Sequence, residues 1–173
     1  ACELCLHLCP QNAPEPIIYR LLMELLDELD RLPLHMRPLV ERLRNFELRL
    51  LEAMGLGLSL VQCATCGNDV PTRPYVPFDV PRGGVHCPDT CFGGPTPTEL
   101  GLIFSGLSGG LPEAVRAALV ALQSAPSSQL PTGISQPVLG ACRDVLLAVM
   151  RHHLGRDLRA VEFISKLNKT LLF

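Results

Sequence analysis

The chain has 173 residues, a formal net charge of −2 and a leucine-rich composition that contains no tryptophan. Its length suits one domain with a core large enough to stand without disulfide bridges. The charge argues against a globally basic nucleic-acid binder, and no apolar run reaches the roughly 18 residues of a membrane-spanning helix. A leucine-rich chain that is poor in aromatic, Val and Ile residues favours a helical fold.

Helices are predicted on both sides of the middle of the chain. Residues 1–9 resemble the middle of a helix and lack the regions of a signal peptide, so we expect a fragment of a longer protein. A second helix is predicted over 17–32, where Pro33 stops it, and a third over 38–54, where Gly55 is a natural end. Later helices are predicted from Thr96 onward and over 112–122, 137–154 and 159–167.

Residues 59–95 have a different character, because cysteine pairs, prolines and glycines replace the helical pattern. Prolines at this spacing exclude a helix and predict extended segments and turns. We expect a hairpin with 73–80 as one strand, Gly83 and Gly84 as the turn, and Val85 leading into the second cysteine pair. The predicted fold is mainly α, a helical bundle interrupted by a small zinc-knuckle β-hairpin insert. Its expected parts are a first core segment (1–58), the insert (59–95) and a second core segment (96–173), in one domain.

Four cysteines of the insert form two close pairs with C-x2-C and C-x3-C spacing. Zinc takes four thiolates tetrahedrally, and a short gap lets one turn present two sulfurs to the ion. Disulfides and a thioredoxin-type redox pair are alternatives, but the missing signal sequence and βαβ setting favour a metal. We expect a closed structural site that contributes ~10 kcal/mol or more to an insert with almost no core of its own. The predicted Zn²⁺ ligands are Cys63, Cys66, Cys87 and Cys91.

The other cysteines allow two interpretations. Cys2, Cys5 and Cys9 share one stripe of a helix, where small buried residues are commoner than a second metal site. Cys142 lies on the apolar arc of its predicted helix, so we expect it in the core.

A few polar residues could have a special role. Glu47 falls in the middle of an apolar helical arc, so it needs a cation such as Arg44 or a proton, unless the helix is rotated and Glu47 reaches the surface. His153 is expected to be a core histidine bonded to a last-turn carbonyl. His86 and Asp89 are spare ligands if a cysteine of the second pair is displaced. No nucleophilic triad or phosphate loop can be assembled from the spacing, so no enzymatic activity is expected.

Four stretches, taken in order, carry a resemblance to a known family. RNFELRLLEAMGLGLSLVQCATCG (44–67) joins a helix to the first cysteine pair, FDVPRGGVHC (78–87) enters the second pair, and LLAVMRHHLGRDLRAVEFI (146–164) follows later. These resemble the helix-to-zinc junction, the hairpin and the closing helices of the bacterial recombination mediator RecO. The leading 29 residues fit the first helical pair of that family.

The resemblance implies a cytoplasmic, nucleoid-associated protein of DNA repair and recombination, without enzymatic activity. RecO-like proteins anneal complementary single strands and, with RecR, help load RecA onto gaps coated by the single-stranded-DNA-binding protein SSB. The resemblance also implies that the helical domain docks the acidic, apolar C-terminal tail of SSB, for which a hydrophobic groove rimmed by arginines would be suitable. Candidate contacts to DNA or a partner are Arg42, Arg49, Arg151, Arg156, Arg159 and Lys166.

Two features depart from the family pattern. The second knuckle is C-x3-C where the family usually has C-x2-C, and the N-terminal OB-fold barrel of the family, implicated in DNA binding and RecR contact, is absent from this sequence. The alternative interpretation is a zinc-stapled helical protein-interaction module with no nucleic-acid role.

Overall fold

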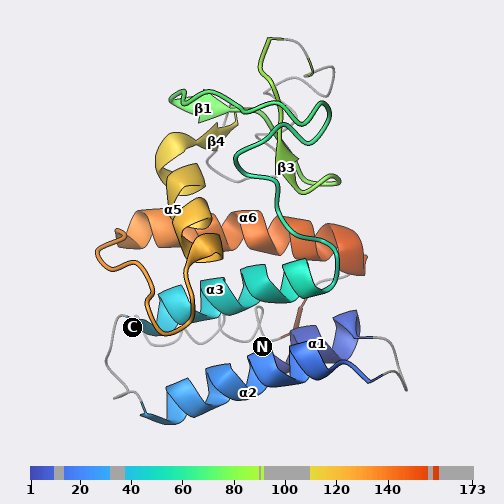
Figure 1. The fold of residues 1–173 in the computed structure, drawn as a ribbon, viewed down its shortest axis with the longest axis vertical. Coiled ribbons are helices and arrows are strands. Elements are labelled where there is room, and N and C mark those ends of the chain that lie inside the picture. The colour runs from blue at the N-terminus through green and yellow to red at the C-terminus, as the bar shows by residue number, and fades with distance from the viewer. Residues whose placement is uncertain (10–13, 32–37, 90, 92–109, 156–157, 160–173) are drawn as a thin grey trace, which may run out of the picture.

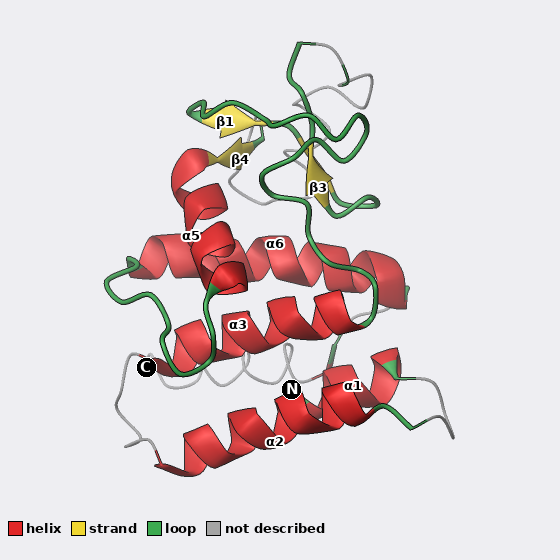
Figure 2. Cartoon of the chain, viewed as in Figure 1, coloured by secondary structure: helices red, strands yellow, loops and turns green. Residues whose placement is uncertain are grey.

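The computed structural model describes residues 1–9, 14–31, 38–89, 91, 110–155 and 158–159. They form a helical body with a smaller, strand-containing lobe at one end (Figures 1 and 2). The helices are α1 (Cys2–Leu8), α2 (Pro16–Arg31), α3 (Pro38–Ala53), α5 (Glu113–Ser124) and α6 (Gln136–Leu154). The strands are β1 (Tyr75–Val76), β2 (Phe78–Asp79), β3 (Gly84–Val85) and β4 (Leu111–Pro112).

The predicted mainly helical class is confirmed, and helix positions agree closely with the sequence pattern. None of the helices in the described ranges is long and apolar enough to cross a membrane. The predicted helix from Thr96 lies outside the described residues, as does all but the start of the one predicted over 159–167.

The helical body is built around α3, which packs against α2, α5 and α6. In α2, the buried side chains of Ile18, Leu21 and Leu25 recur at helical spacing and face inward, so this helix contributes one apolar stripe. In α3, Leu50 and Leu51 are completely buried. Figure 1 shows α3 running between α2 and α6, with α5 crossing in front of α6 toward the strands. Burial of these aliphatic side chains is therefore the main source of stability in the body.

Glycine follows α3, as the sequence predicts for Gly55, and also α6. Gly155 follows α6 with φ 63°, and its N–H donates to the carbonyl of Arg151 at 2.9 Å. Gly55 follows α3 with φ 73°. Both conformations are left-handed, which glycine adopts without steric cost.

The predicted hairpin exists, but its turn covers 80–83, because Gly84 belongs to β3 and pairs with Asp79, and the predicted strand over 73–80 is wrong. Pro77 divides it into β1 and β2, which pair with different partners. β2 pairs antiparallel with β3, with Phe78 opposite Val85, whereas β1 pairs antiparallel with β4, with Val76 opposite Leu111. The cause is local, since proline has no N–H to donate and interrupts a ladder.

As expected, the insert has no separate core, but it contributes several buried apolar side chains to the core of the helices. Val76 and Val85 are completely buried, and Phe78 is only 1% exposed. Leu60, Val70 and Val80 are buried as well. These residues belong to the same apolar cluster as the helices, so the insert is an extension of the core and not a separate flap.

Candidate metal centre

The first cysteine pair sits in a tight turn between two extended segments. Gln62 and Asp69 form an antiparallel bridge at the base of this turn. The N–H of Cys63 donates to the carbonyl of Asn68 at 2.8 Å, and the N–H of Gly67 donates to the carbonyl of Cys63 at 2.9 Å. Gly67 has φ 74°, a left-handed conformation that closes the turn. The turn therefore presents both sulfurs of C-x2-C to the same side.

The second pair follows β3 directly. The N–H of Val85 donates to the carbonyl of Ser59 at 2.8 Å, which holds β3 against the segment that leads into the first turn. Two residues later comes Cys87, and the N–H of Cys91 donates to the carbonyl of Cys87 at 3.3 Å. This turn accommodates the extra residue of C-x3-C and still brings both sulfurs back to one point.

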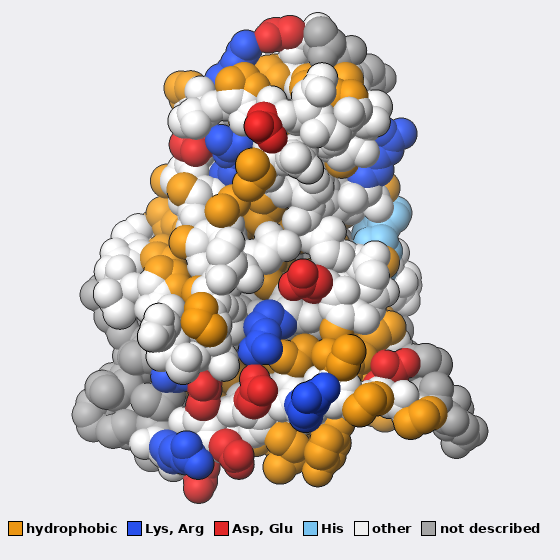
Figure 3. Space-filling model, in the orientation of Figure 1, with side chains coloured by type: hydrophobic (Ala, Val, Ile, Leu, Met, Phe, Trp, Pro, Cys, Tyr) orange, Lys and Arg blue, Asp and Glu red, His pale blue; other side chains and the backbone are white. Residues whose placement is uncertain are grey.

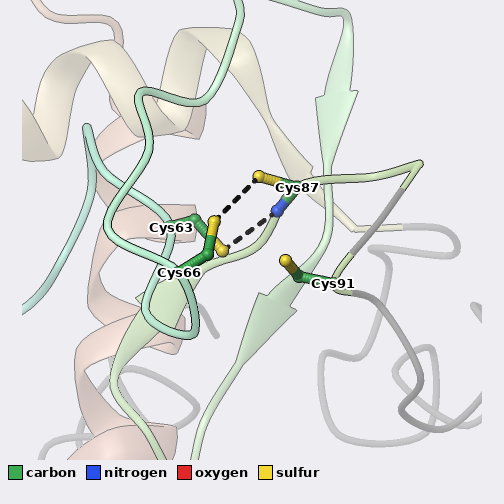
Figure 4. Close-up of side chains that lie close together, drawn as sticks. All are labelled: Cys63, Cys66, Cys87 and Cys91. Carbon is green, nitrogen blue, oxygen red and sulfur yellow. Dashed lines mark hydrogen bonds between the residues drawn. The ribbon is translucent and has the colours of Figure 1, made fainter.

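The four predicted ligands converge as shown in Figure 4. One Sγ atom from each of Cys63, Cys66, Cys87 and Cys91 lies within 4.8 Å of all the others, and the Sγ atoms of Cys66 and Cys87 are 3.6 Å apart. A tetrahedron with metal–sulfur bonds of about 2.3 Å has sulfur–sulfur edges of about 3.8 Å. The arrangement therefore fits a thiolate-bound metal ion.

Backbone donors around Cys63 favour its thiolate form. The N–H of Thr65 donates to Cys63 Sγ at 3.5 Å, and the N–H of Cys87 donates to it at 3.3 Å. Burial raises the pKa of the Cys63 thiol, but hydrogen bonds from the amides of Cys66, Cys87 and Thr65 lower that pKa to about 5. A metal ligand must be deprotonated, so this environment prepares Cys63 for coordination.

The spare ligands predicted beside the second pair are engaged elsewhere. His86 is buried, with Nδ1 3.0 Å from Thr65 Oγ1 and Nε2 3.7 Å from Asp79 Oδ2. Asp89 accepts from Arg73 Nη2 at 2.6 Å. The sequence did not predict these polar contacts. Arg73 and Asp89 are 16 residues apart and Thr65 and His86 are 21 residues apart, whereas His86 and Asp79 face each other across the hairpin.

The remaining cysteines do not assemble a second centre. Cys2 is exposed, whereas Cys5 and Cys9 are half-buried. Among the described residues, the four cysteines of the insert are the only group of three or more metal-binding side chains that converges. Cys142 is completely buried, as predicted, and burial raises the pKa of its thiol.

Glu47 is buried in the helical body and lies beside a cation. Its Oε2 is 2.7 Å from Nη1 of Arg44, which is also buried. Burial raises the pKa of the Glu47 carboxyl to about 7, against the opposing effect of Arg44. The rotated-helix alternative is therefore wrong.

The prediction that His153 is a core histidine is also wrong. His153 is exposed at the end of α6, and its ring packs edge-on against His152 at 5.2 Å between centroids.

Two of the predicted partner-contacting arginines lie on α3 and face α2. Arg42 forms an ion pair with Glu28 and donates to the carbonyl of Ser127 at 3.2 Å. Arg49 Nη1 is 3.1 Å from Glu24 Oε2. Figure 3 shows acidic and basic side chains interspersed over the face formed by α2 and α3. These arginines line one small pocket whose other residues include Leu21, Leu25, Asn45 and Phe46.

The other candidates belong to the end of α6 and the residues after it. Arg151 and Arg159 are exposed, and the backbone N–H of Arg159 donates to Glu3 Oε1 at 2.8 Å. Arg156 and Lys166 lie outside the described residues. Arg42 and Arg49 thus share one pocket, whereas Arg151 and Arg159 are separate from it in the fold.

The fold and the cysteine cluster define a mainly helical protein with an insert whose four cysteines could hold a metal ion, and comparison with known proteins gives its family. The profile described as "Recombination protein O C terminal" matches residues 1–102. The DNA repair protein RecO of Anaeromyxobacter sp. (strain K) is 33% identical over 171 residues, which is 99% of this chain and 61% of the relative. The chain therefore belongs to the RecO family.

Other relatives bear the same name. DNA repair protein RecO of Myxococcus xanthus (strain DK1622) is 32% identical over 167 residues, which is 96% of this chain and 59% of the relative. That of Dehalococcoides mccartyi (strain CBDB1) is 36% identical over 90 residues, 51% of this chain and 33% of the relative. The chain spans about 60% of the length of the relatives that match nearly all of it. No solved structure matches the chain.

Proposed function

We propose that this chain is the helical, zinc-containing part of a recombination mediator of DNA repair, which aids single-strand annealing and RecA loading without covalent chemistry. Membership of the RecO family carries the proposal, because the similarity extends over nearly the whole chain. The proposed partners are single-stranded DNA, the C-terminal tail of SSB, RecR and, indirectly, RecA. We also propose that 1–58 and 96–173 form one helical core around the insert, which the packing of α3 against α5 and α6 supports.

We propose zinc as the metal of the cysteine cluster, in a structural role. Four thiolates suit tetrahedral Zn²⁺ and leave no open position for a water molecule. When bound, the ion would cross-link the two turns of the insert. Elemental analysis of the purified chain should give one zinc per chain, with less in Cys91→Ser. Iron in place of zinc, or no metal at all, would contradict this assignment.

Contact with single-stranded DNA is proposed at the end of α6. Arg151 and Arg159 are exposed there, and the sequence places Arg156 and Lys166 in the same segment. Cationic side chains neutralise phosphates and release counterions, so log K falls with log salt by about 0.7 per contact on a single strand. Binding of a labelled oligonucleotide at several salt concentrations tests this contact.

The informative variant is Arg151→Ala combined with Arg159→Ala. We expect it to reduce the salt slope by about 1.4, for two contacts. Arg143→Ala is the control, because Arg143 is an exposed α6 arginine outside the proposed contact segment. A flat salt response of the unchanged chain would favour the alternative, an interaction module with no nucleic-acid role. The ion pairs of Arg42 and Arg49 within the chain are the observation that favours that alternative.

Docking of the SSB tail is proposed at the small pocket between α2 and α3. Its lining combines Arg42 with Leu21 and Phe46, which are buried, and its volume is only about 10 Å³, so apolar side chains of the tail would enter only if α2 and α3 moved apart. The carboxylate of the peptide would have to replace Glu28 at Arg42. In a peptide-binding titration, Glu28→Gln should therefore strengthen binding and Arg42→Ala should weaken it. Equal affinities for both variants and the unchanged chain would place the tail elsewhere.

A further inference from the structure

A ring of four polar residues, with three hydrogen bonds and one longer contact between His86 and Asp79, joins the two halves of the metal centre. Arg82 Nη1 donates to Thr65 Oγ1 at 2.7 Å, and Thr65 Oγ1 lies 3.0 Å from His86 Nδ1. His86 Nε2 lies 3.7 Å from Asp79 Oδ2, and the backbone N–H of Arg82 donates to Asp79 Oδ1 at 3.1 Å. The ring contains no cysteine, yet it touches both of the segments that carry the cysteines.

The chemistry of the groups sets the direction of the hydrogen bonds. A guanidinium can only donate, so Thr65 Oγ1 accepts from Arg82 and keeps its own hydrogen for His86 Nδ1. The other ring nitrogen, Nε2, lies on the side of the Asp79 carboxylate at 3.7 Å, which is too long for a hydrogen bond. His86 is only 3% exposed, and within the described residues Thr65 is the hydrogen-bond partner of its ring, so the imidazole depends on that hydroxyl in place of water.

The ring links segments that are far apart in the sequence. Thr65 lies between the two cysteines of the first turn, and His86 immediately precedes Cys87. Because one hydrogen bond joins Thr65 to His86, it fixes the separation of the first turn from the second. The two turns are thus held together through side chains as well as through any shared ion.

The backbone packing beneath the ring is equally close. A Cβ atom added at Gly84 would lie 2.7 Å from the Cβ of Ala64 and 3.1 Å from the Cβ of Ser59. The N–H of Ala64 donates to the carbonyl of Val85 at 2.8 Å. The first turn therefore rests directly on β3, and the ring closes over that contact.

We propose that Thr65, Arg82 and His86 are positioning residues of the metal centre, which hold the two cysteine pairs at coordinating separation before the ion binds and so raise metal affinity. This inference rests on the proposed metal site. The ring differs from ordinary surface pairing because its histidine is buried and because each member also borders a cysteine-bearing segment or the hairpin turn. Groups that orient ligands without touching the metal typically contribute 10–100-fold in metal affinity.

The test is the zinc affinity of the purified chain, measured by competition with a chromophoric chelator. Thr65→Val keeps the shape of the side chain but removes the hydroxyl, and we expect its Kd to rise by about 10–100-fold. Thr65→Ser restores the hydroxyl and should restore the affinity. Arg143→Gln removes an exposed arginine outside the ring and should leave the Kd unchanged.

A second readout separates positioning from a general loss of stability. The absorption spectrum of the Co²⁺-loaded chain reports the geometry of the sulfur ligands, so Thr65→Val should shift its visible bands and Thr65→Ser should not. If Thr65→Val does not fold, Arg82→Gln decides by the same two measurements, because the Arg82 side chain is 58% exposed and its loss leaves the core intact.

The outcomes are distinguishable. Unchanged affinity and an unchanged Co²⁺ spectrum in Thr65→Val, or in Arg82→Gln where the first variant is unfolded, would overturn the positioning role and leave the metal site in place. Failure of the unchanged chain to bind zinc or cobalt would overturn the proposed metal site, and the positioning role with it.

Discussion

The helical body and the insert both contain buried apolar side chains, but different interactions hold their backbones in place. In the body, helices of 12 to 19 residues satisfy their own backbone hydrogen bonds, and α2, α3, α5 and α6 each bury an apolar face. In the insert, each strand has two residues. Hairpins this short are marginal by themselves, so the insert depends on tertiary contacts and cross-links.

This difference indicates where each region is vulnerable. The stability of the body should fall when buried volume is lost anywhere in its core. The insert should be destabilised most by changes that move its two turns apart, although Val76, Phe78 and Val85 anchor it to the body. Five changes test this contrast.

Removal of the metal should have the largest effect, and it should be local. Structural zinc can contribute on the order of 10 kcal/mol to folding, and the two turns lose their shared cross-link without it. Hydrogen exchange before and after chelation should show faster exchange over 59–91, with protection retained in α3 and α6. Equal loss of protection in both regions would contradict the contrast between them, because the body would then also depend on the ion.

Leu119→Ala should destabilise the body without affecting the metal centre. Leu119 is completely buried on α5, which packs on α3 and α6. A cavity at such a site costs about 2–5 kcal/mol in free energy of unfolding, which denaturant titration would measure. Zinc affinity should not change. Leu26→Ala is the control, since the Leu26 side chain is 40% exposed and its truncation should cost much less.

Gly84→Ala should weaken the insert by overpacking. The new Cβ would lie 2.7 Å from the Cβ of Ala64, so the first turn must move away from β3. Overpacking of this kind costs about 1–3 kcal/mol. We expect a lower zinc affinity together with lower thermal stability. A variant with unchanged zinc affinity would show that the contact at Gly84 does not set the separation of the cysteine pairs.

The same contrast explains what could be predicted from the sequence. The helix predicted over 38–54 is observed as Pro38–Ala53, because periodicity and a terminal glycine are local signals. The cysteine spacing predicted which four sulfurs converge. The β1–β4 pairing was missed because two-residue strands have no periodicity and their partners, such as Val76 and Leu111, are 35 residues apart. His153 was misjudged because the apolar arc of its helix does not stay buried to the last turn, where His152 and His153 are both exposed.

The polar ring was unpredictable for a related reason. Thr65 and His86 are 21 residues apart, and no spacing rule relates a threonine within a cysteine turn to a histidine beside another. Their contact depends on how the hairpin packs on the first turn. The cysteine spacing thus predicted which sulfurs converge, whereas only the tertiary structure shows the polar contacts between the two turns.

Glu47→Gln should change how the stability of the body depends on pH. The pKa of Glu47 is raised by burial from 4.5 to about 7, so between these values the folded chain binds more protons than the unfolded chain. Stability therefore falls as pH rises through this window and levels off above pH 7. The slope contributed by this residue is at most about 1 kcal/mol per pH unit.

The measurement is the difference in unfolding free energy between the unchanged chain and Glu47→Gln from pH 5 to 8. That difference should decrease with rising pH, and effects of any bound metal cancel because both proteins contain the same four cysteines. Glu52→Gln is the control, because Glu52 is an exposed glutamate on the same helix. Parallel pH profiles for Glu47→Gln and the unchanged chain would show that Glu47 is ionised in the fold with an ordinary pKa.

Gly140→Ala should have the smallest effect and the opposite sign. Gly140 lies inside α6, and a Cβ built there meets nothing within 4 Å. Alanine in a helix interior is favoured over glycine by about 0.5–1 kcal/mol, so the midpoint of thermal unfolding should rise. The identical substitution at Gly84 should lower it, because there the backbone of one turn rests on a strand. If both substitutions changed stability in the same direction, close backbone packing in the insert would not explain the difference between the two regions.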